Sequence, residues 1–299
     1  MSSEIPFVRD IDIEYGRCDQ VSPLIRRVTA NNPGGFTFKG TGTYIVGKGE
    51  VAVIDPGPLM NDHVEALLAA IEGETVSHIL ITHTHMDHSP AAEPLKKLTG
   101  APTLAFGPHG GEKKDDGARE EGADWKFQPD IKLEDGDIIE GDGWTFEAVF
   151  TPGHTSNHMC FALQEEKALF TGDHVMGWST SVVSPPDGNM SDYFNSLKKL
   201  LERDDEIYWP THGPAITNPQ SFVRAYLVHR RQREAQILRQ IEEGHTTIPA
   251  MVEAMYADID KRLHPAARRS VLAHLIHMVE TGRVATDGAP GIENQYRLS

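Results

Sequence analysis

The chain has very few cysteines and no long apolar segment, and each absence excludes a class of protein. Its 299 residues include only Cys18 and Cys160, too few for a disulfide framework or for a zinc site built from thiolates. No run approaches the roughly 20 apolar residues that a membrane-spanning helix needs. The amino-terminal MSSEIPFVRDIDIEYG also lacks the basic start and apolar centre of a secretory signal. We therefore expect a cytoplasmic protein with no membrane partner.

Basic residues are also scarce, since 28 Lys and Arg stand against 44 Asp and Glu, a net charge of −16. The imbalance lies in residues 1–215, where 17 basic residues face 35 acidic ones, a net of −18. Residues 216–299 hold 11 against 9, a net of +2. A phosphate backbone is bound largely by cationic side chains, and a region this acidic therefore disfavours a long nucleic acid. As a partner, a small-molecule substrate is favoured over RNA.

Histidine, by contrast, is concentrated in one place. Residues 82–88 read THTHMDH and contain His83, His85, Asp87 and His88 directly after an apolar run. Zinc takes about four ligands at roughly 2.0–2.2 Å for nitrogen and oxygen, and a single strand-to-helix turn cannot direct four such side chains at one ion. His83 and His85 project together from the end of an extended segment, whereas Asp87 and His88 lie past the turn. The cluster predicts two neighbouring metal positions.

Three further segments offer matching ligands: His154 in TPGHT, Asp173 in TGDH and His212 in PTHGP. Each follows a strand-like apolar run and lies in a turn marked by Gly or Pro. A single His or Asp in a turn is more often a cap or turn residue. Together with the first cluster, however, they make five His and two Asp. That set is enough for two metal ions that keep open positions for water and substrate.

This pattern resembles the metallo-beta-lactamase superfamily, on the order of THTHMDH, His154, Asp173 and His212 and on VAVIDPG at 51–57. The resemblance implies the α/β (α+β) class and a four-layer αββα sandwich, with the site at the edge where the loops of two sheets meet. It also implies a division of the ligands, with Asp173 bridging both metals. The first metal would take His83, His85 and His154, and the second Asp87, His88 and His212.

A bridged dinuclear site lowers the pKa of bound water to near 7, so a metal-bridging hydroxide is the expected nucleophile. The metals would also polarise the substrate oxygen and stabilise the leaving group. Asp87 and Asp173 are the predicted catalytic residues, and Asp87 would also hold or move a proton. Two zinc ions are the expected cofactors, with iron or manganese as alternatives. Asp55 is either a turn residue or a partner that orients a ligand.

The hydrophobic pattern predicts a domain boundary near residue 215. Residues 1–215 would form the hydrolase domain. Residues 216–299 read as three helices, near 219–243, 246–259 and 265–282, followed by a polar hairpin, which together look like a winged helix. This appended module narrows the resemblance to the beta-lactamase-like 2 branch of the superfamily. It could cap the site, form a homodimer or bind nucleic acid.

The first hypothesis is a dinuclear zinc hydrolase acting on a small ester, thioester or lactone. One alternative is a single-strand endoribonuclease of the beta-lactamase-like 2 type, and another is a non-catalytic, metal-stabilised nucleic-acid-binding protein. Cationic side chains on the predicted helices would serve these alternatives, namely Arg224, Arg230, Arg231, Arg233, Arg239, Arg268 and Arg269. The predicted substrate-binding residues are Phe36, Trp178 and His229. The missing secretory signal counts against antibiotic defence as the main role.

Overall fold

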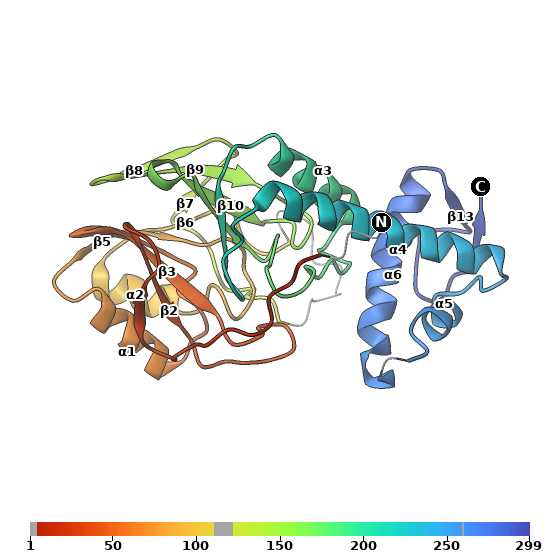
Figure 1. Cartoon of the computed structure of the whole chain (residues 1–299), viewed down its shortest axis with the longest axis horizontal. Helices are drawn as coiled ribbons and strands as arrows, with labels where there is room; N and C mark the ends of the chain where they lie inside the picture. Colours follow the sequence, from red (N-terminus) through yellow and green to blue (C-terminus); the bar gives the residue numbers. More distant parts are fainter. Residues whose placement is uncertain (1–4, 111–121, 259) are drawn as a thin grey trace.

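Two β-sheets packed face to face form the centre of the larger lobe (Figure 1). The structure is a computed structural model that describes residues 5–110, 122–258 and 260–299. The first sheet has its strands in chain order, and only the pairs from β4 to β7 are parallel. These strands are β1 (Cys18–Gln20), β2 (Ile25–Thr29), β3 (Gly42–Lys48), β4 (Glu50–Ile54), β5 (Thr75–Leu80), β6 (Thr103–Ala105) and β7 (Ile131–Lys132).

The second sheet has the order β12-β11-β10-β9-β8. Its strands are β8 (Ile138–Gly141), β9 (Trp144–Phe150), β10 (Met159–Leu163), β11 (Ala168–Gly172) and β12 (Ile207–Pro210). Side chains alternate between the two faces of a strand. Trp144 and Phe146 of β9 accordingly pack with Tyr44 of β3 in the core between the sheets, whereas Val149 belongs to the core on the other side.

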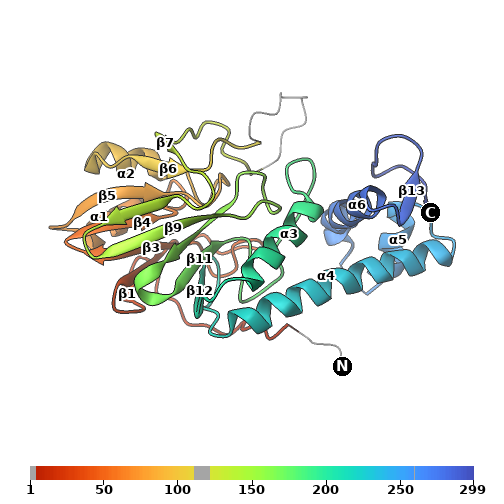
Figure 2. The same cartoon turned by 90° about the horizontal axis from the view of Figure 1, so that it is seen from above.

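Helices cover the outer face of each sheet and complete the predicted αββα sandwich. On the first sheet lie α1 (Asn61–Ala70) and α2 (Ala92–Thr99), which bury Leu67 and Leu95 against the strands. On the second lie α3 (Met190–Leu201) and the start of α4 (Pro219–Glu242). Figure 2 shows these layers from above. A 3₁₀ turn, η1 (Gln164–Glu166), joins β10 to β11.

The last quarter of the chain forms a smaller helical lobe with the predicted winged-helix order. Helix α4 runs out of the sandwich into this lobe (Figures 1 and 2). Its other elements are α5 (Ile248–Met255), η2 (Lys261–Leu263), α6 (His264–Glu280), β13 (Val284–Thr286) and β14 (Tyr296–Leu298). The lobe has a hydrophobic core of its own, which includes Ile237, Met251 and Leu275. None of the helices in the described ranges is long and apolar enough to cross a membrane.

Strand direction explains why distant segments meet at one edge. Strands β11 and β12 are parallel, so the loops that follow them leave the sheet at the same edge. Strand β9 runs in that direction too, because it and β11 are both antiparallel to β10. The backbone joins the two sheets here, since Met159 N donates to Thr82 O at 2.8 Å and Gly42 N to Thr211 O at 2.9 Å.

Candidate metal centre

All seven predicted ligands converge at this edge, on the loops that follow β5, β9, β11 and β12. Two glycines permit the close approach. Gly153, directly before His154, has a φ of +134°, and a Cβ there would lie 2.4 Å from the backbone of Tyr193. Gly172, directly before Asp173, has a φ of +50°, and a Cβ there would lie 2.6 Å from His158 Nε2. A side chain at either position would push a ligand loop away from its neighbours.

The first group of ligand atoms contains three imidazole nitrogens. His83 Nε2 lies 2.9 Å from His85 Nδ1, which lies 3.2 Å from His154 Nε2. Ligand atoms around a tetrahedral ion bound at roughly 2.0–2.1 Å lie about 3.3 Å apart. The three nitrogens therefore have the spacing of ligands around one metal ion.

The second group contains Asp87, His88 and His212. Asp87 Oδ2 lies 3.1 Å from His212 Nε2 and 3.5 Å from His88 Nε2. Asp173 stands between the groups. Its Oδ1 faces the second, at 3.4 Å from His212 Nε2, and its Oδ2 faces the first, at 3.8 Å from His154 Nε2. This is the arrangement that a bridging carboxylate requires.

Several of these atoms lack the partners that buried polar atoms normally have. His88 Nε2, His212 Nε2 and Asp173 Oδ1 are buried and make no hydrogen bond among the described residues, although they lie close to one another. Burial opposes ionisation of Asp87, yet His88 and His212 hold the pKa of its carboxyl below the ordinary value. Burial likewise lowers the pKa of His83, which favours the neutral form. Ionised carboxylates and neutral imidazoles are the forms that bind metal, so Asp87 and His83 have the protonation states of metal ligands. Burial opposes protonation of His88 and His212, but the neighbouring carboxylates raise their pKa. Bound metal ions would take the place of those protons, so the set of donors fits a dinuclear site.

Further hydrogen bonds fix the orientation of the ligand rings, as metal sites require. His88 Nδ1 lies 2.9 Å from Asp55 Oδ2, and His83 Nδ1 lies 3.1 Å from Thr82 Oγ1. Backbone carbonyls hold two more rings. The Nδ1 atoms of His154 and His212 lie 2.6 Å and 3.1 Å from the oxygens of Val182 and Gly40, respectively.

Asp55 has both of the roles that its sequence left open. Its φ of +48° places it at the turn after β4, and it is fully buried. Its carboxylate accepts from Thr82 N at 2.8 Å, from Thr82 Oγ1 at 2.7 Å and from Thr211 Oγ1 at 3.0 Å, besides facing His88. Thr211, which the sequence did not single out, lies beside the ligand His212.

Two other histidines lie next to the ligands without joining them. His158 Nε2 accepts a hydrogen bond from the backbone N–H of Asp173 at 3.3 Å, and its Nδ1 lies 2.9 Å from Thr151 Oγ1. The sequence missed buried His109. Its ring centroid lies 6.0 Å from that of His85, and its Nδ1 lies 3.1 Å from Thr84 Oγ1.

The three predicted substrate-binding residues lie in different surroundings. Trp178 stacks on Phe38 with centroids 4.7 Å apart and borders Gly213, next to a ligand. Phe36 is 70% exposed on the loop that supplies the Gly40 carbonyl. Trp178 and Phe36 thus flank the loops of the centre, and their role remains a prediction.

His229 lies on α4, directly before Arg230. Burial, together with Arg230, Arg233 and His274, lowers its pKa to about 4. Its charged neighbours therefore belong to α4 and α6, and a substrate-binding role for His229 also remains a prediction.

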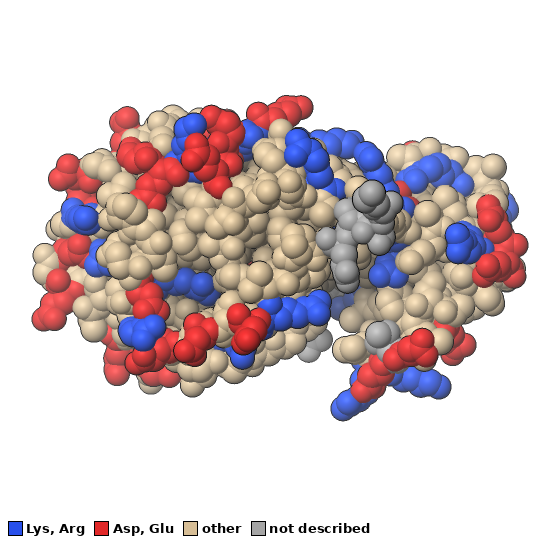
Figure 3. Space-filling view, in the orientation of Figure 1, with Lys and Arg blue, Asp and Glu red and all other residues tan. Residues whose placement is uncertain are grey.

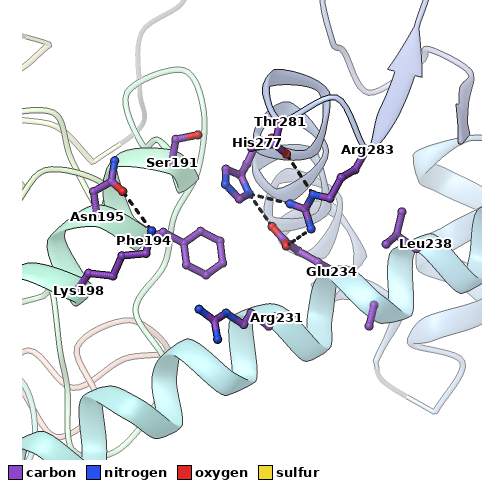
Figure 4. Close-up of a pocket in the computed structure, with 11 residues that line it drawn as sticks. Ser191, Phe194, Asn195, Lys198, Arg231, Glu234, Leu238, His277, Thr281 and Arg283 are labelled. Atoms are coloured by element: carbon purple, nitrogen blue, oxygen red, sulfur yellow. Dashed lines mark hydrogen bonds and ion pairs between the residues drawn. The ribbon is translucent and has the colours of Figure 1, made fainter. Parts of the chain in front are cut away.

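The cationic patch proposed for nucleic acid loses members in the structure. Arg230 is only 4% exposed, and Arg233 lies over the ring of Tyr256, 5.0 Å from its centroid. On the face shown in Figure 3, acidic side chains lie mainly over the outer parts of both lobes, and Lys and Arg lie nearer the seam. The seam, where α3 of the sandwich faces α4 and α6, holds a pocket of about 680 Å³ (Figure 4). Its lining includes Lys198, Arg231 and Glu234 but no candidate ligand.

Comparison with known proteins identifies both parts of the chain. The family model described as metallo-beta-lactamase superfamily matches residues 37–212. A second, the beta-lactamase associated winged helix domain, matches residues 247–292. Among solved structures, a beta-lactamase domain protein from Burkholderia ambifaria has a TM-score of 0.78 at 18% identity, over 97% of this chain and 96% of its own. A metallo-beta-lactamase family protein from Thermus thermophilus has a TM-score of 0.75 at 22% identity, over 94% and 100%.

Three named relatives are similar over most of the chain. Lactamase-like protein adaB of Aspergillus niger is 30% identical over 97% of this chain and 94% of its own length. The atrochrysone carboxyl ACP thioesterase dmxR1 of Cryptosporiopsis sp. is 32% identical over 93% and 86%. An atrochrysone carboxyl ACP thioesterase of Aspergillus fumigatus is 32% identical over 88% and 84%.

Proposed function

The chain belongs to the metallo-beta-lactamase superfamily and is a metal-dependent hydrolase, and we propose that it hydrolyses the thioester of an acyl group carried on an acyl carrier protein. The convergence of all seven predicted ligands at one sheet edge carries the hydrolase part of the proposal. The thioester part is supported by relatives about 32% identical that are named acyl-carrier-protein thioesterases. Zinc as the metal and a cytoplasmic location belong to the proposal as well.

The chemistry of the site follows from its donor set. Two bound metal ions would supply a Lewis acid for the carbonyl oxygen and water acidified to near neutral pH. His83, His85 and His154 would hold one ion, and Asp87, His88 and His212 the other, with Asp173 between them. In the overall reaction, water adds to the acyl carbon, the carbon–sulfur bond breaks, and the products are a carboxylic acid and a thiol.

Asp87 is the residue best placed to handle the proton of the attacking water. Its side chain is 26% exposed, whereas that of Asp173 is 11% exposed, so Asp87 meets the incoming substrate more directly. Burial opposes ionisation of this carboxyl, but its contacts with His88 and His212 lower its pKa. The ionised carboxylate can accept a hydrogen bond from the attacking water and orient it, and we propose that it passes the proton of that water toward the leaving sulfur.

The test compares one acyl group in different linkages. The metal-loaded protein is given an acyl carrier protein thioester, the corresponding N-acetylcysteamine thioester, the matching oxygen ester and a lactone. Single-stranded RNA is assayed in parallel. We expect thiol release from both thioesters, with kcat/KM at least about tenfold above that for the oxygen ester, a difference of about 1.4 kcal/mol in transition-state stabilisation. Faster cleavage of RNA or of the lactone would replace the thioesterase by one of the alternatives.

A further inference from the structure

We propose that Arg230, on α4, is a positioning residue. It holds the loop formed by residues 174–182, called the ligand loop, on which the metal ligands His154 and Asp173 depend. Helix α4 begins after the last candidate ligand in the sequence and continues into the winged-helix lobe. Arg230 acts on the ligands through other residues and not by direct contact. The proposal rests on the metal centre of the proposed function and is independent of the substrate.

Residues 181 and 182 connect this loop to two ligands. The Ser181 hydroxyl donates a hydrogen bond to the backbone carbonyl of Asp173, the bridging candidate. The Val182 carbonyl faces His154 Nδ1 at 2.6 Å, so the opposite nitrogen of that ring is left for a metal. A shift of residues 181 and 182 would therefore disturb both groups, since Asp173 faces both.

The guanidinium of Arg230 holds this segment from the side of α4. Its Nη2 donates to the Ser181 carbonyl at 2.5 Å. The guanidinium carbon also lies 5.0 Å from the ring centroid of Tyr193, a cation–π contact. Tyr193 in turn donates from its hydroxyl to the carbonyl of His174 at 2.7 Å, directly after Asp173. Arg230 thus reaches the ligand loop at both ends.

The burial of this charge supports a specific role. Arg230 is 4% exposed, and its Nε is buried without a hydrogen-bond partner within the described ranges. Burying a charge is costly unless it is paired and fully hydrogen-bonded. A residue that only filled space here would be more stable as an apolar side chain.

Tyr226, one helical turn before Arg230, holds the same loop. Its hydroxyl lies 2.7 Å from the Met176 carbonyl and 2.6 Å from the Ser179 carbonyl, and it accepts from Met176 N at 3.1 Å. Residues four apart on a helix project from the same face. One face of α4 therefore fixes residues 176–181.

The test measures metal binding, ligand geometry and stability, and it needs no substrate. Arg230→Met removes the charge and the donors, Arg230→Lys keeps one charged donor, and Arg231→Met is the matched control, because Arg231 is exposed and faces the seam pocket (Figure 4). Zinc affinity is measured by chelator competition, ligand geometry by the visible spectrum of the Co²⁺ form, and stability by melting of the metal-free protein.

We expect Arg230→Met to weaken zinc binding by about 10- to 100-fold, the range for groups that orient metal ligands, and to shift the Co²⁺ spectrum. Arg230→Lys should recover part of the affinity, and Arg231→Met should stay within about twofold of the parent. If Arg230→Met does not fold, Ser181→Ala, which removes only the hydroxyl contact to Asp173, should change affinity and spectrum in the same direction.

Two results would overturn the proposal. One is a folded Arg230→Met protein with the parent's zinc affinity and Co²⁺ spectrum. The other is a lower melting temperature alone, which would make Arg230 a structural residue of the α4 interface. None of these three measurements needs a substrate. Absence of thioesterase activity would therefore refute the proposed function without deciding this inference.

Discussion

The protein contains two buried clusters of histidine and carboxylate. They differ in whether side chains of the same chain pair with the carboxylate oxygens. In the winged-helix lobe, Glu234 Oε1 faces His277 Nδ1 at 2.7 Å, and Glu234 Oε2 accepts from Arg283 at 2.8 Å (Figure 4). At the sandwich edge, by contrast, His88 Nε2 and Asp173 Oδ1 are buried without such partners among the residues that the structure describes. The Glu234 carboxylate is paired with Arg283 of the same chain, whereas the edge cluster leaves a buried carboxylate oxygen of Asp173 for a bound cation. Residue types alone therefore do not identify a metal site.

Removal of the bridging carboxylate should have the largest effect. Asp173→Ala is expected to abolish hydrolysis, with kcat/KM at least about a thousandfold lower, or roughly 4 kcal/mol of transition-state stabilisation. Metal content should fall from two ions per chain toward one or none, because Asp173 faces both groups. Elemental analysis and a thioester assay check this. Full activity in the variant would show that the edge cluster is not a dinuclear centre.

A change in Asp55, which contacts the ligand His88 but is not itself a ligand, should have an intermediate effect. Asp55→Asn keeps the size of the side chain, and Asn tolerates the positive φ. It removes the negative charge opposite His88 Nδ1, so we expect metal affinity or kcat to fall about 10- to 100-fold. Chelator competition and steady-state kinetics measure this. Unchanged values for both would mean that Asp55 serves only the turn after β4.

A change in the cluster around Glu234 should affect the stability of the fold and its pH dependence but not metal binding. Burial opposes ionisation of Glu234, but its contacts with His274, His277 and Arg283 lower its pKa below the ordinary 4.5. A carboxyl with a lowered pKa stabilises the fold above its unfolded pKa, and this contribution is lost as the pH falls through the folded pKa. Glu234→Gln should therefore cost about 1–3 kcal/mol at pH 7.

Below pH 4.5 this difference from the parent protein should shrink. Urea unfolding of metal-free protein at several pH values measures it, with exposed Glu253→Gln on α5 as the matched control. A difference that grows in acid would contradict the assignment. Loss of bound metal in Glu234→Gln would show that the two clusters are coupled.

The smallest effect is expected at the exposed rim of the centre. Because Phe36 is 70% exposed, Phe36→Ala should change the free energy of unfolding by less than about 0.5 kcal/mol. If the ring contacts the acyl group, KM should rise severalfold at constant kcat, and bulky acyl groups should be affected more than acetyl. The same KM for all acyl lengths would remove Phe36 from the substrate-binding residues.

The sequence predicted the ligands well because coordination chemistry restricts them to few residue types in recognisable turns. His83, His154, Asp173 and His212 each follow a strand that hydrophobic pattern alone indicates, and the parallel arrangement of β11 and β12 brings two of these turns together. The αββα layers were predicted from the family that these motifs resemble, and the winged-helix order was predicted from the hydrophobic pattern of residues 216–299. The boundary at residue 215 remains a prediction.

Other features could not be predicted because they depend on contacts between distant segments. The sequence pattern does not indicate strands β1, β2, β7 and β8, since they are short or polar. In β2, Arg26 interrupts the apolar pattern, and it pairs with Glu74, 2.6 Å away in the folded chain. The role of Arg230 was misread for the same reason, because nothing in its helical pattern distinguishes a buried arginine from an exposed one. Tertiary contacts with residues 181 and 193 decide it.

The most direct test is the number of metal ions per chain, measured by elemental analysis while thioester turnover is followed through chelation and reconstitution. We expect about two ions per chain, loss of turnover as they are removed, and recovery when zinc is restored. Full thioester turnover by protein with no metal would contradict this expectation.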